Sequence, residues 1–179
     1  MSATKTNAKS NTKTTAVATT KAAADKTANQ EAANTSQIQI PTFISVESTI
    51  GAVSLLAMKS QTHKYLFLSD YEWLILPAIS AKQFVLFRGQ QNEPIAFVSW
   101  ANVSEQVERR LTDKNSKLQP ADWKSGNNTY IIDIISPFGP AKALLKQLYE
   151  KQFQNKNVYI LRPREDGKGV ERKLLKEIL

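Results

Sequence analysis

One segment of this sequence, residues 129–136, limits the possible folds more than any other. It reads Thr-Tyr-Ile-Ile-Asp-Ile-Ile-Ser, so apolar residues occupy both alternating sets of positions. A strand with this pattern is buried on both faces, which places it in the interior of a covered sheet. The rest of the chain must therefore supply neighbouring strands and covering helices. We predict an α+β fold with this strand at the centre of the sheet.

The central strand contains one charged residue, Asp133. Regular alternation predicts that Ile131 and Ile135 share the face of Asp133 and that Ile132 and Ile134 lie on the other face. A buried carboxylate without a partner is strongly destabilising, so Asp133 needs one. That partner is either structural, such as a backbone amide or an arginine, or it belongs to a functional site.

Hydrophobic periodicity predicts the other elements. A capping box from Ser69 to Glu72 starts one helix, which Pro77 breaks or restarts. Two strands around the polar turn 89–93 form an antiparallel hairpin. The predicted helices are Val46–Lys59, the segment from Ser69, Ser104–Asp113, Ala141–Phe153 and Val170–Leu179, the further strands are Gln83–Arg88, Pro94–Ala101 and Val158–Leu161, and 114–128 is predicted to be a loop.

The first 36 residues differ in composition from the rest of the chain. They contain ten Ala and nine Thr, and the first aromatic residue of the chain is Phe43. Such a segment buries too little apolar surface to offset the entropy lost on ordering. We therefore predict a disordered Thr/Ala/Lys-rich tail over residues 1–40 and a folded domain over residues 41–179.

Several classes of function are excluded by residue counts and missing motifs. The chain has no cysteine and a single histidine, which argues against disulfides, cysteine nucleophiles and a protein-bound metal. Neither a phosphate-binding loop nor a glycine-rich turn for coenzyme A is present. No apolar run is long enough to span a membrane and no hydrophobic leader is visible, so the expected location is the cytoplasm.

The formal net charge of +8 implies an acidic partner: nucleic acid, an anionic membrane or an acidic protein. Nucleic acid is disfavoured because no nucleic-acid-binding motif is recognisable. The basic residues of the C-terminal half form either an ordinary solvated face or a docking surface for an acidic protein. They are Lys142, Lys146, Lys151, Lys156, Arg162, Arg164, Lys168, Arg172, Lys173 and Lys176.

The only histidine, His63, is predicted to lie in a short polar loop just after the helix 46–59. A lone histidine is either an ordinary surface or core residue or a catalytic base. A carboxylate bonded to one ring nitrogen fixes the tautomer and increases the basicity of the other nitrogen. Asp133 is the obvious carboxylate for that role.

Six segments form an ordered set along the chain: IGAVSLL (50–56), SxxH (60–63), LxLPAI (74–79) with QF (83–84), PIAFVSWA (94–101), DWKSG (122–126) and IDIISPFG (132–139). Taken together and in this order, they resemble the RTX toxin-activating lysine acyltransferases of the haemolysin-activating type. The resemblance covers about residues 50–162, with Gln61, Asn127, Ser136 and Tyr130 as mild departures from the family pattern.

The resemblance implies a fold similar to the GNAT N-acyltransferases. It also implies that His63 and Asp133 are catalytic and that Ser60 is accessory. The acyl donor is then a fatty acyl chain on acyl carrier protein rather than on coenzyme A, with no bound cofactor, and the acceptors are internal lysines of an RTX protoxin. Family members are cytoplasmic and tend to dimerise, so a homodimer is one state to test. An apolar groove for the chain is expected, and its candidates are Leu74, Ile75, Leu76, Phe84, Phe97 and Trp100, for each of which a core position is the alternative.

The chemistry leaves two routes open. A lysine amine with a pKa of ~10.4 must lose a proton, at about 4.6 kcal/mol near pH 7, before it attacks a thioester. His63 either accepts that proton or attacks the thioester first and forms an acyl-imidazole. Two other classes of function compete: a non-catalytic chaperone that binds acyl carrier protein or toxin, and a basic nucleic-acid-binding protein.

Overall fold

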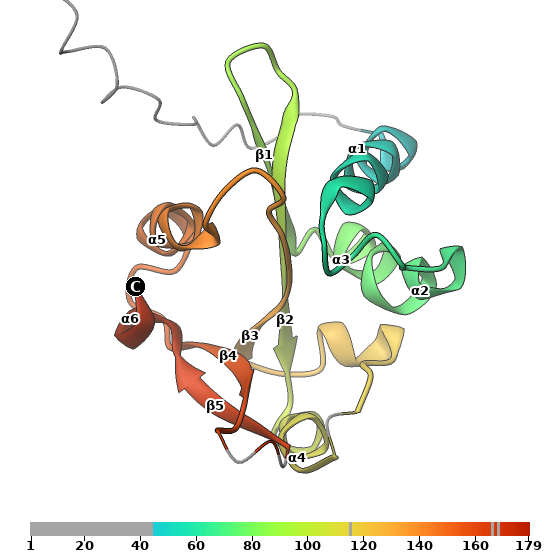
Figure 1. Ribbon diagram of the computed structural model, residues 1–179. Helices are drawn as coiled ribbons and strands as arrows, with labels where there is room; N and C mark the ends of the chain where they lie inside the picture. Colours follow the sequence, from blue (N-terminus) through green and yellow to red (C-terminus); the bar gives the residue numbers. More distant parts are fainter. Residues whose placement is uncertain (1–44, 115, 166, 168) are drawn as a thin grey trace, which may run out of the picture. The chain divides into compact units, whose positions relative to one another are not determined.

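The strand predicted to be central, β3 (Asn128–Ile135), lies in the middle of a five-stranded sheet with the order β1-β2-β3-β4-β5 (Figure 1). The computed structural model describes residues 45–179, apart from residues 115, 166 and 168. All neighbouring strands pair antiparallel except β3 and β4, which run parallel. The predicted tail and the boundary near residue 40 lie outside the described residues.

The remaining elements surround β3 in chain order. The other strands are β1 (Phe84–Arg88), β2 (Pro94–Val103), β4 (Val158–Pro163) and β5 (Val170–Leu174). The helices are α1 (Val46–Lys59), α2 (Leu68–Leu74), α3 (Leu76–Ala81), α4 (Glu105–Lys114), the short 3-10 helix η1 (Pro120–Trp123), α5 (Ala141–Gln152) and α6 (Leu175–Ile178).

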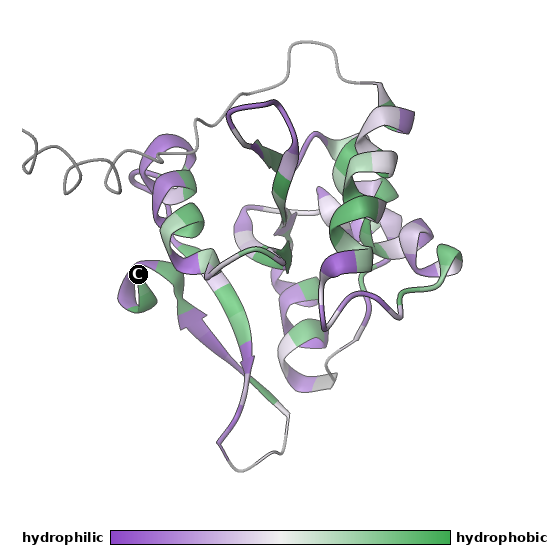
Figure 2. Ribbon diagram, turned by 45° about the horizontal axis from the view of Figure 1, so that its top comes forward, coloured by the Kyte–Doolittle hydropathy of each residue, from purple (hydrophilic) through white to green (hydrophobic). Residues whose placement is uncertain are grey.

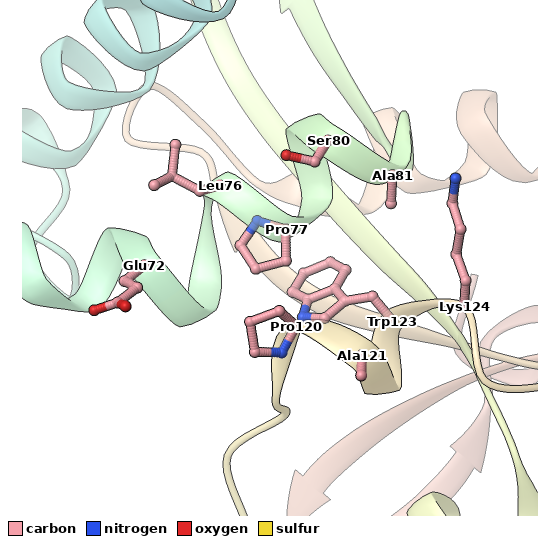
Figure 3. Close-up of a pocket in the computed structure, with 9 residues that line it drawn as sticks. All are labelled: Glu72, Leu76, Pro77, Ser80, Ala81, Pro120, Ala121, Trp123 and Lys124. Carbon is pink, nitrogen blue, oxygen red and sulfur yellow. The ribbon is translucent and has the colours of Figure 1, made fainter.

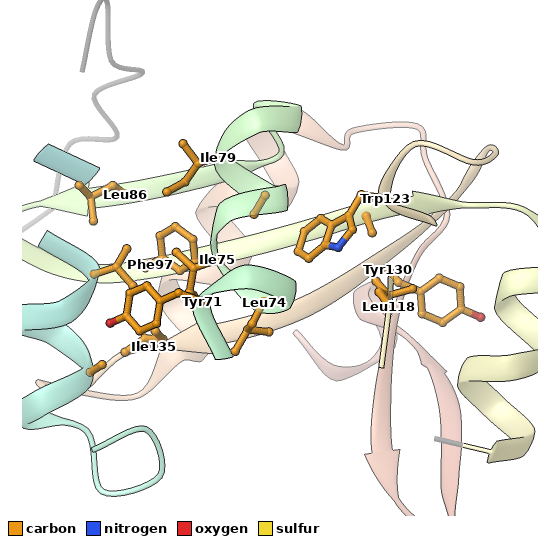
Figure 4. Packing of buried hydrophobic residues seen from close by; sticks show 14 of the residues in the cluster. Tyr71, Leu74, Ile75, Ile79, Leu86, Phe97, Leu118, Trp123, Tyr130 and Ile135 are labelled. Carbon is orange, nitrogen blue, oxygen red and sulfur yellow. The ribbon is translucent and has the colours of Figure 1, made fainter. Parts of the chain in front are cut away.

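Helices cover both faces of the sheet, which explains why β3 is apolar on both sides. Helices α1, α2 and α3 lie on one face, and α5 and α6 on the other (Figure 1). The first core contains Leu74, Ile75, Phe97 and Trp123 (Figure 4). The second is built around Trp100, where α5 turns its hydrophobic side to the sheet and its hydrophilic side outward (Figure 2).

The structure confirms the α+β class, a mostly antiparallel central sheet and its flanking helices. Helix α1 begins and ends where the sequence predicts, since the Ser45 hydroxyl accepts a hydrogen bond from the backbone N–H of Ser48. The hairpin β1–β2 is also confirmed. In the predicted loop 114–128, η1 buries Trp123, which is 1% exposed.

The prediction of a helix over Val170–Leu179 is wrong for its first half. Residues 170–174 form β5, which pairs antiparallel with β4, and only α6 is helical. The turn into β5 contains Gly167 and Gly169 at φ of 70° and 89°, a conformation that favours glycine. Once that turn brings the segment back beside β4, the pairing overrides its helical preference.

The capping box predicted at Ser69 is also displaced. Helix α2 begins at Leu68, and the Asp70 carboxylate accepts hydrogen bonds from the Phe67 backbone N–H and the Trp73 indole N–H. A carboxylate is a stronger acceptor than a hydroxyl at a helix N-terminus. The Asp70 carboxylate, rather than the Ser69 hydroxyl, therefore determines where the helix begins.

A polar network joins α4 to β3 and β5. The Glu108 carboxylate accepts hydrogen bonds from the Tyr130 hydroxyl, the Asn128 amide and the Arg172 guanidinium. Burial acts to raise the pKa of Glu108, but the bond from Tyr130 and the bond and charge of Arg172 outweigh it, so its pKa lies below the ordinary 4.5. Burial, and then the bond to Glu108, raise the pKa of Tyr130.

We expect Glu108→Gln to lower the free energy of unfolding at pH 7 by about 1–3 kcal/mol, because charge-assisted bonds become neutral ones. Since the pKa of Glu108 is lower in the folded state, its contribution is complete above about pH 4.5 and is lost as the pH falls through the folded value. Thermal unfolding between pH 7 and pH 3 measures both effects. Glu105→Gln, on the same helix with its side chain 83% exposed, is the matched control. Equal acid sensitivity of wild type and Glu108→Gln would contradict the prediction.

Candidate active site

His63 lies in a tight turn immediately after α1. Ser60 caps the helix with its N–H bonded to the Ala57 carbonyl, and the Lys64 N–H bonds back to the Ser60 carbonyl. The His63 carbonyl in turn accepts from the Leu66 N–H at 3.0 Å. These backbone bonds define the conformation of the turn 61–65. In this turn the His63 side chain is 16% exposed.

Asp133 lies beside a β-bulge in the central strand. Across the β2–β3 pair, Ser99 faces Asp133 but Trp100 faces Ile131, so Ile132 is an extra residue on β3. The extra residue reverses the alternation on one side of the bulge. Ile131 consequently packs in the core of α5 and α6, while Ile132 packs in the core of α1–α3.

Because of the bulge, the prediction that Ile131 shares the face of Asp133 is wrong. Ile135 packs in the core of α1–α3 as predicted for the face of Asp133, but Ile131 lies on the opposite face. Regular alternation does not anticipate an inserted residue, and nothing in the isoleucine pattern marks its position. Bulges are common beside functional sites, where they redirect a side chain. Here the bulge determines which residues surround the Asp133 carboxylate on the face of the sheet that α1 covers.

The structure brings His63 and Asp133 together although they are 70 residues apart in sequence. His63 Nε2 lies 2.9 Å from Asp133 Oδ1, and the two side chains are 16% and 13% exposed. Oδ1 also accepts a hydrogen bond from the Ile134 backbone N–H at 2.9 Å. The partner expected for the buried carboxylate is therefore both a backbone amide and the imidazole. Within residues 45–179 as described, no arginine contacts it.

The bond to Asp133 determines which ring nitrogen is basic. A carboxylate only accepts hydrogen bonds, so in the neutral ring the proton is on Nε2 and the lone pair is on Nδ1. Ser60 Oγ and Thr62 Oγ1 each lie 2.8 Å from Nδ1, and 3.1 Å from each other. The ring thus has a carboxylate behind it and two hydroxyls in front, which is the arrangement of a general base or nucleophile.

Sequence reasoning placed Ser60 near this site but missed Thr62. Ser60 is buried at 6% exposure, whereas Thr62 is exposed. The only available signal was that Thr62 directly precedes the histidine. That signal is weak, because the direction of a side chain within a turn depends on the backbone of the turn.

The chain matches the model of the RTX toxin acyltransferase family, HlyC, over residues 43–175. It belongs to this family. It is 32% identical to the lysine-acyltransferase RtxC of Vibrio cholerae over 131 residues, 72% of this chain and 86% of that protein. It is 38% identical over 102 residues to the protein-lysine myristoyltransferase HlyC of Escherichia coli, 57% of this chain and 58% of that protein.

A third relative is the RTX-I toxin-activating lysine-acyltransferase ApxIC of Actinobacillus pleuropneumoniae, which is 38% identical over 99 residues. That match covers 55% of this chain and 57% of the relative. The resemblance drawn from the six ordered segments is therefore confirmed at the level of the family. His63, Asp133 and Ser60 all lie inside the matched range of 43–175.

Most of the apolar residues considered for an acyl groove in this family member are core residues. Leu74, Ile75, Phe97 and Trp100 are at most 7% exposed. Leu76 differs, since it is 36% exposed and borders a cavity of about 470 Å³ between α3 and η1 (Figure 3). The cavity is lined by Glu72, Leu76, Pro77, Ser80, Ala81, Pro120, Ala121, Trp123 and Lys124.

The basic residues of the C-terminal half differ in their surroundings. Lys142, Lys146 and Lys151 are exposed on α5. Arg172 is paired with Glu108 and Lys173 with Glu171. Lys168 lies outside the described residues.

Two negative observations apply to the part of the chain that the structure describes. Its histidine, aspartate and glutamate side chains nowhere gather in threes to form a potential metal site. None of its helices combines the length and the apolar character required to cross a membrane.

We expect Ser60 and Thr62 to act redundantly on the ring. Each hydroxyl can donate to Nδ1, so Ser60→Ala or Thr62→Val alone should leave the ring in place, whereas the double variant should loosen the ring and speed exchange of the Nε2–H proton with solvent. The Nε2–H tautomer should persist in all three variants, because Asp133 still accepts from Nε2. His63 is the only histidine, so its two ring nitrogen signals need no assignment in a ¹⁵N NMR spectrum. A double variant with the wild-type exchange rate would show that the hydroxyls do not hold the ring.

Proposed function

We propose that this protein is a protein-lysine acyltransferase. It transfers a fatty acyl chain from acyl carrier protein to the ε-amino groups of internal lysines in an RTX protoxin and thereby activates the toxin. The observation that carries the proposal is the contact of His63 Nε2 with Asp133 Oδ1 at 2.9 Å, made by the two residues that the resemblance to the family implies are catalytic. Ser60 has the accessory role of donating to Nδ1.

The lysine ammonium first releases one proton to solvent, and the neutral amine that attacks the thioester then has a second proton to lose. His63 Nδ1 takes a proton from the amine as the amine nitrogen attacks the thioester carbonyl, and the C–S bond then breaks. The proton passes from the imidazolium to the departing thiolate, so the products are an amide and a thiol. Asp133 stabilises the imidazolium that exists between these two transfers. The hydroxyls of Ser60 and Thr62 must turn aside when the amine approaches Nδ1.

A covalent route uses the same atoms in a different order. Nδ1 attacks the thioester, the C–S bond breaks, and the departing thiolate takes a proton from solvent. The neutral lysine amine then attacks the acyl-imidazolium, releases a proton to solvent and frees the imidazole as the amide forms. Incubation with acyl donor in the absence of protoxin separates the two routes. An acyl-enzyme observed by mass spectrometry supports the covalent route. Ternary-complex kinetics with no trapped species support direct transfer.

We propose the acyl donor from the charges of the two proteins. Acyl carrier protein is acidic, and exposed Lys142, Lys146 and Lys151 on α5 offer a complementary surface. We expect turnover with acyl carrier protein as donor to fall as salt rises, since contacts between exposed charges are screened. Acyl-coenzyme A is expected to be a poor donor. Equal turnover with acyl-coenzyme A, or no effect of salt, would refute this choice of donor.

The decisive experiment is coexpression with an RTX protoxin, followed by mass spectrometry of toxin peptides. We expect a fatty-amide mass increment on internal lysines with the wild-type enzyme and none with a His63 variant. A variant that still activates the toxin without acylating it would instead support the chaperone. Salt-dependent retention of DNA or RNA without acylation would support the nucleic-acid-binding protein. We place the reaction in the cytoplasm, and light scattering tests whether the enzyme is a homodimer.

A further inference from the structure

Two buried oxygen atoms beside the His63–Asp133 pair lack partners. Ser99 is 0% exposed, and its hydroxyl has no hydrogen-bond partner among the described residues. The same holds for Oδ2 of Asp133, the carboxylate oxygen that does not bind His63. Buried polar atoms without partners are rare in proteins because each one is destabilising. Two of them close together require an explanation.

The two residues face each other across the sheet. Ser99 on β2 is the direct partner of Asp133 in the antiparallel β2–β3 register. Directly opposed residues project their side chains to the same face with Cβ atoms about 4.5–5.5 Å apart. A serine hydroxyl and a carboxylate at that separation come within hydrogen-bonding distance after rotation about the Cα–Cβ bond of the serine.

The register shift confines this geometry to one position. The pairing of Ser99 with Asp133 is the last before the bulge, and the next residue of β2, Trp100, faces Ile131 in the core of α5 and α6. Phe97, two residues before Ser99, packs in the core of α1–α3. Ser99 is therefore the residue of β2 that is aligned with the carboxylate on the α1 side.

We infer that the Ser99 hydroxyl donates a hydrogen bond to Asp133 Oδ2 and that Ser99 is a positioning residue for the His63–Asp133 pair. Three donors then hold the carboxylate: His63 Nε2–H and Ile134 N–H on Oδ1, and the Ser99 hydroxyl on Oδ2. A carboxylate fixed at both oxygens cannot rotate away from the imidazole. Ser99 thus acts on His63 through Asp133 and never touches the substrate.

The role of this bond in catalysis rests on the proposed function, but the bond itself does not. Asp133 must stay correctly oriented while His63 carries a proton, and a donor to Oδ2 holds the carboxylate in that orientation. Ser99 is held in the β2–β3 ladder, whereas His63 lies on a turn. Ser60, His63, Asp133 and Ser99 therefore form a hydrogen-bonded chain whose buried end, Ser99, belongs to the sheet.

The test compares Ser99→Ala, Ser99→Thr and a control, Thr129→Val. Alanine removes the hydroxyl, and threonine retains it while adding a methyl group. Thr129 is a buried hydroxyl on β3, 4% exposed, which donates to Asn102 Oδ1 rather than to Asp133. The control thus deletes a buried hydroxyl from the same strand pair without touching the carboxylate.

Three readouts need no acyl-transfer assay. In the full-length protein, Ser99→Ala should lower the fraction of His63 in the Nε2–H tautomer and speed exchange of the Nε2–H proton with solvent. Ser99→Thr and Thr129→Val should match wild type in both measurements. Ser99→Ala should also lower the unfolding temperature, because it leaves Oδ2 without its donor. If the hydroxyl is instead unpaired, its removal raises the unfolding temperature.

Kinetics provides the fourth readout. With the acyl donor and protoxin, Ser99→Ala should lower kcat roughly tenfold with KM within about twofold, as for loss of an interaction that acts in the transition state. Wild-type tautomer balance, exchange and kcat in Ser99→Ala, or a threonine variant as impaired as the alanine variant, would overturn the inference. If the variants show the predicted NMR differences but the wild-type protein acylates nothing, the proposed function is refuted while the inferred hydrogen bond is supported.

Discussion

Replacing His63 with glutamine is expected to abolish acyl transfer, with a loss of about 10²–10⁴-fold in kcat/KM. Glutamine is chosen because its amide nitrogen occupies nearly the position of Nε2, the atom that bonds to Asp133 Oδ1. The variant therefore keeps a donor to the buried carboxylate but has no basic nitrogen where Nδ1 lies. A loss of activity in this variant therefore reflects the missing basic nitrogen and not a change in the packing around Asp133.

The fold of His63→Gln should survive. The side chain lies on a turn, and its hydrogen bonds go to Ser60, Thr62 and Asp133. Circular dichroism and thermal unfolding check this, and acylation of protoxin lysines by mass spectrometry measures the activity. Lys59→Gln introduces the same side chain at an exposed position of α1 and should retain activity. A folded His63→Gln enzyme that acylates at the wild-type rate would leave His63 without a catalytic role.

Replacing Asp133 with asparagine is expected to lower activity by about 10²–10³-fold with little change in stability. The amide has the shape of the carboxylate and still accepts from Nε2–H and from the Ile134 N–H. It lacks the negative charge that stabilises the imidazolium formed when Nδ1 takes the proton. The loss therefore falls on kcat, because that charge is needed only after proton transfer has begun.

Stability separates this explanation from misfolding. Removing a buried charge also removes its desolvation penalty, so the free energy of unfolding should fall by no more than about 1 kcal/mol. Asp113→Asn, the same change at an exposed position of α4, is the control and should keep both activity and stability. A double variant of His63 and Asp133 should be little worse than His63→Gln, because the carboxylate acts through the imidazole. Additive losses would assign Asp133 a separate role.

Local patterns in the sequence were sufficient for much of the fold. The spacing of apolar residues predicted α1, and two alternating segments around a polar turn predicted the hairpin β1–β2. The helical prediction for residues 170–174 failed because that segment becomes a strand only by pairing with β4. Such pairing depends on a neighbour that the segment itself does not specify.

The candidate site was predicted by residue type but not by geometry. His63 and Asp133 were identified from the rarity of histidine and the anomaly of a charged residue in an apolar strand, and Ser60 came from the resemblance to the family. Thr62 and Ser99 were missed because hydroxyls are common and carry no signal until their neighbours are known. The contact between His63 and Asp133 joins residues 70 positions apart.

A buried apolar strand at the centre of an α+β sheet, with a single carboxylate that needs a partner, can be predicted from the order of residues alone. The family can be predicted in the same way, through an ordered set of short segments. The folded chain was needed to show that the partner is the imidazole, that a bulge reverses the faces of Ile131 and Ile132, and that Ser99 lies opposite Asp133. Periodicity records how each segment is buried, whereas register and side-chain contacts depend on how separate segments are placed against one another.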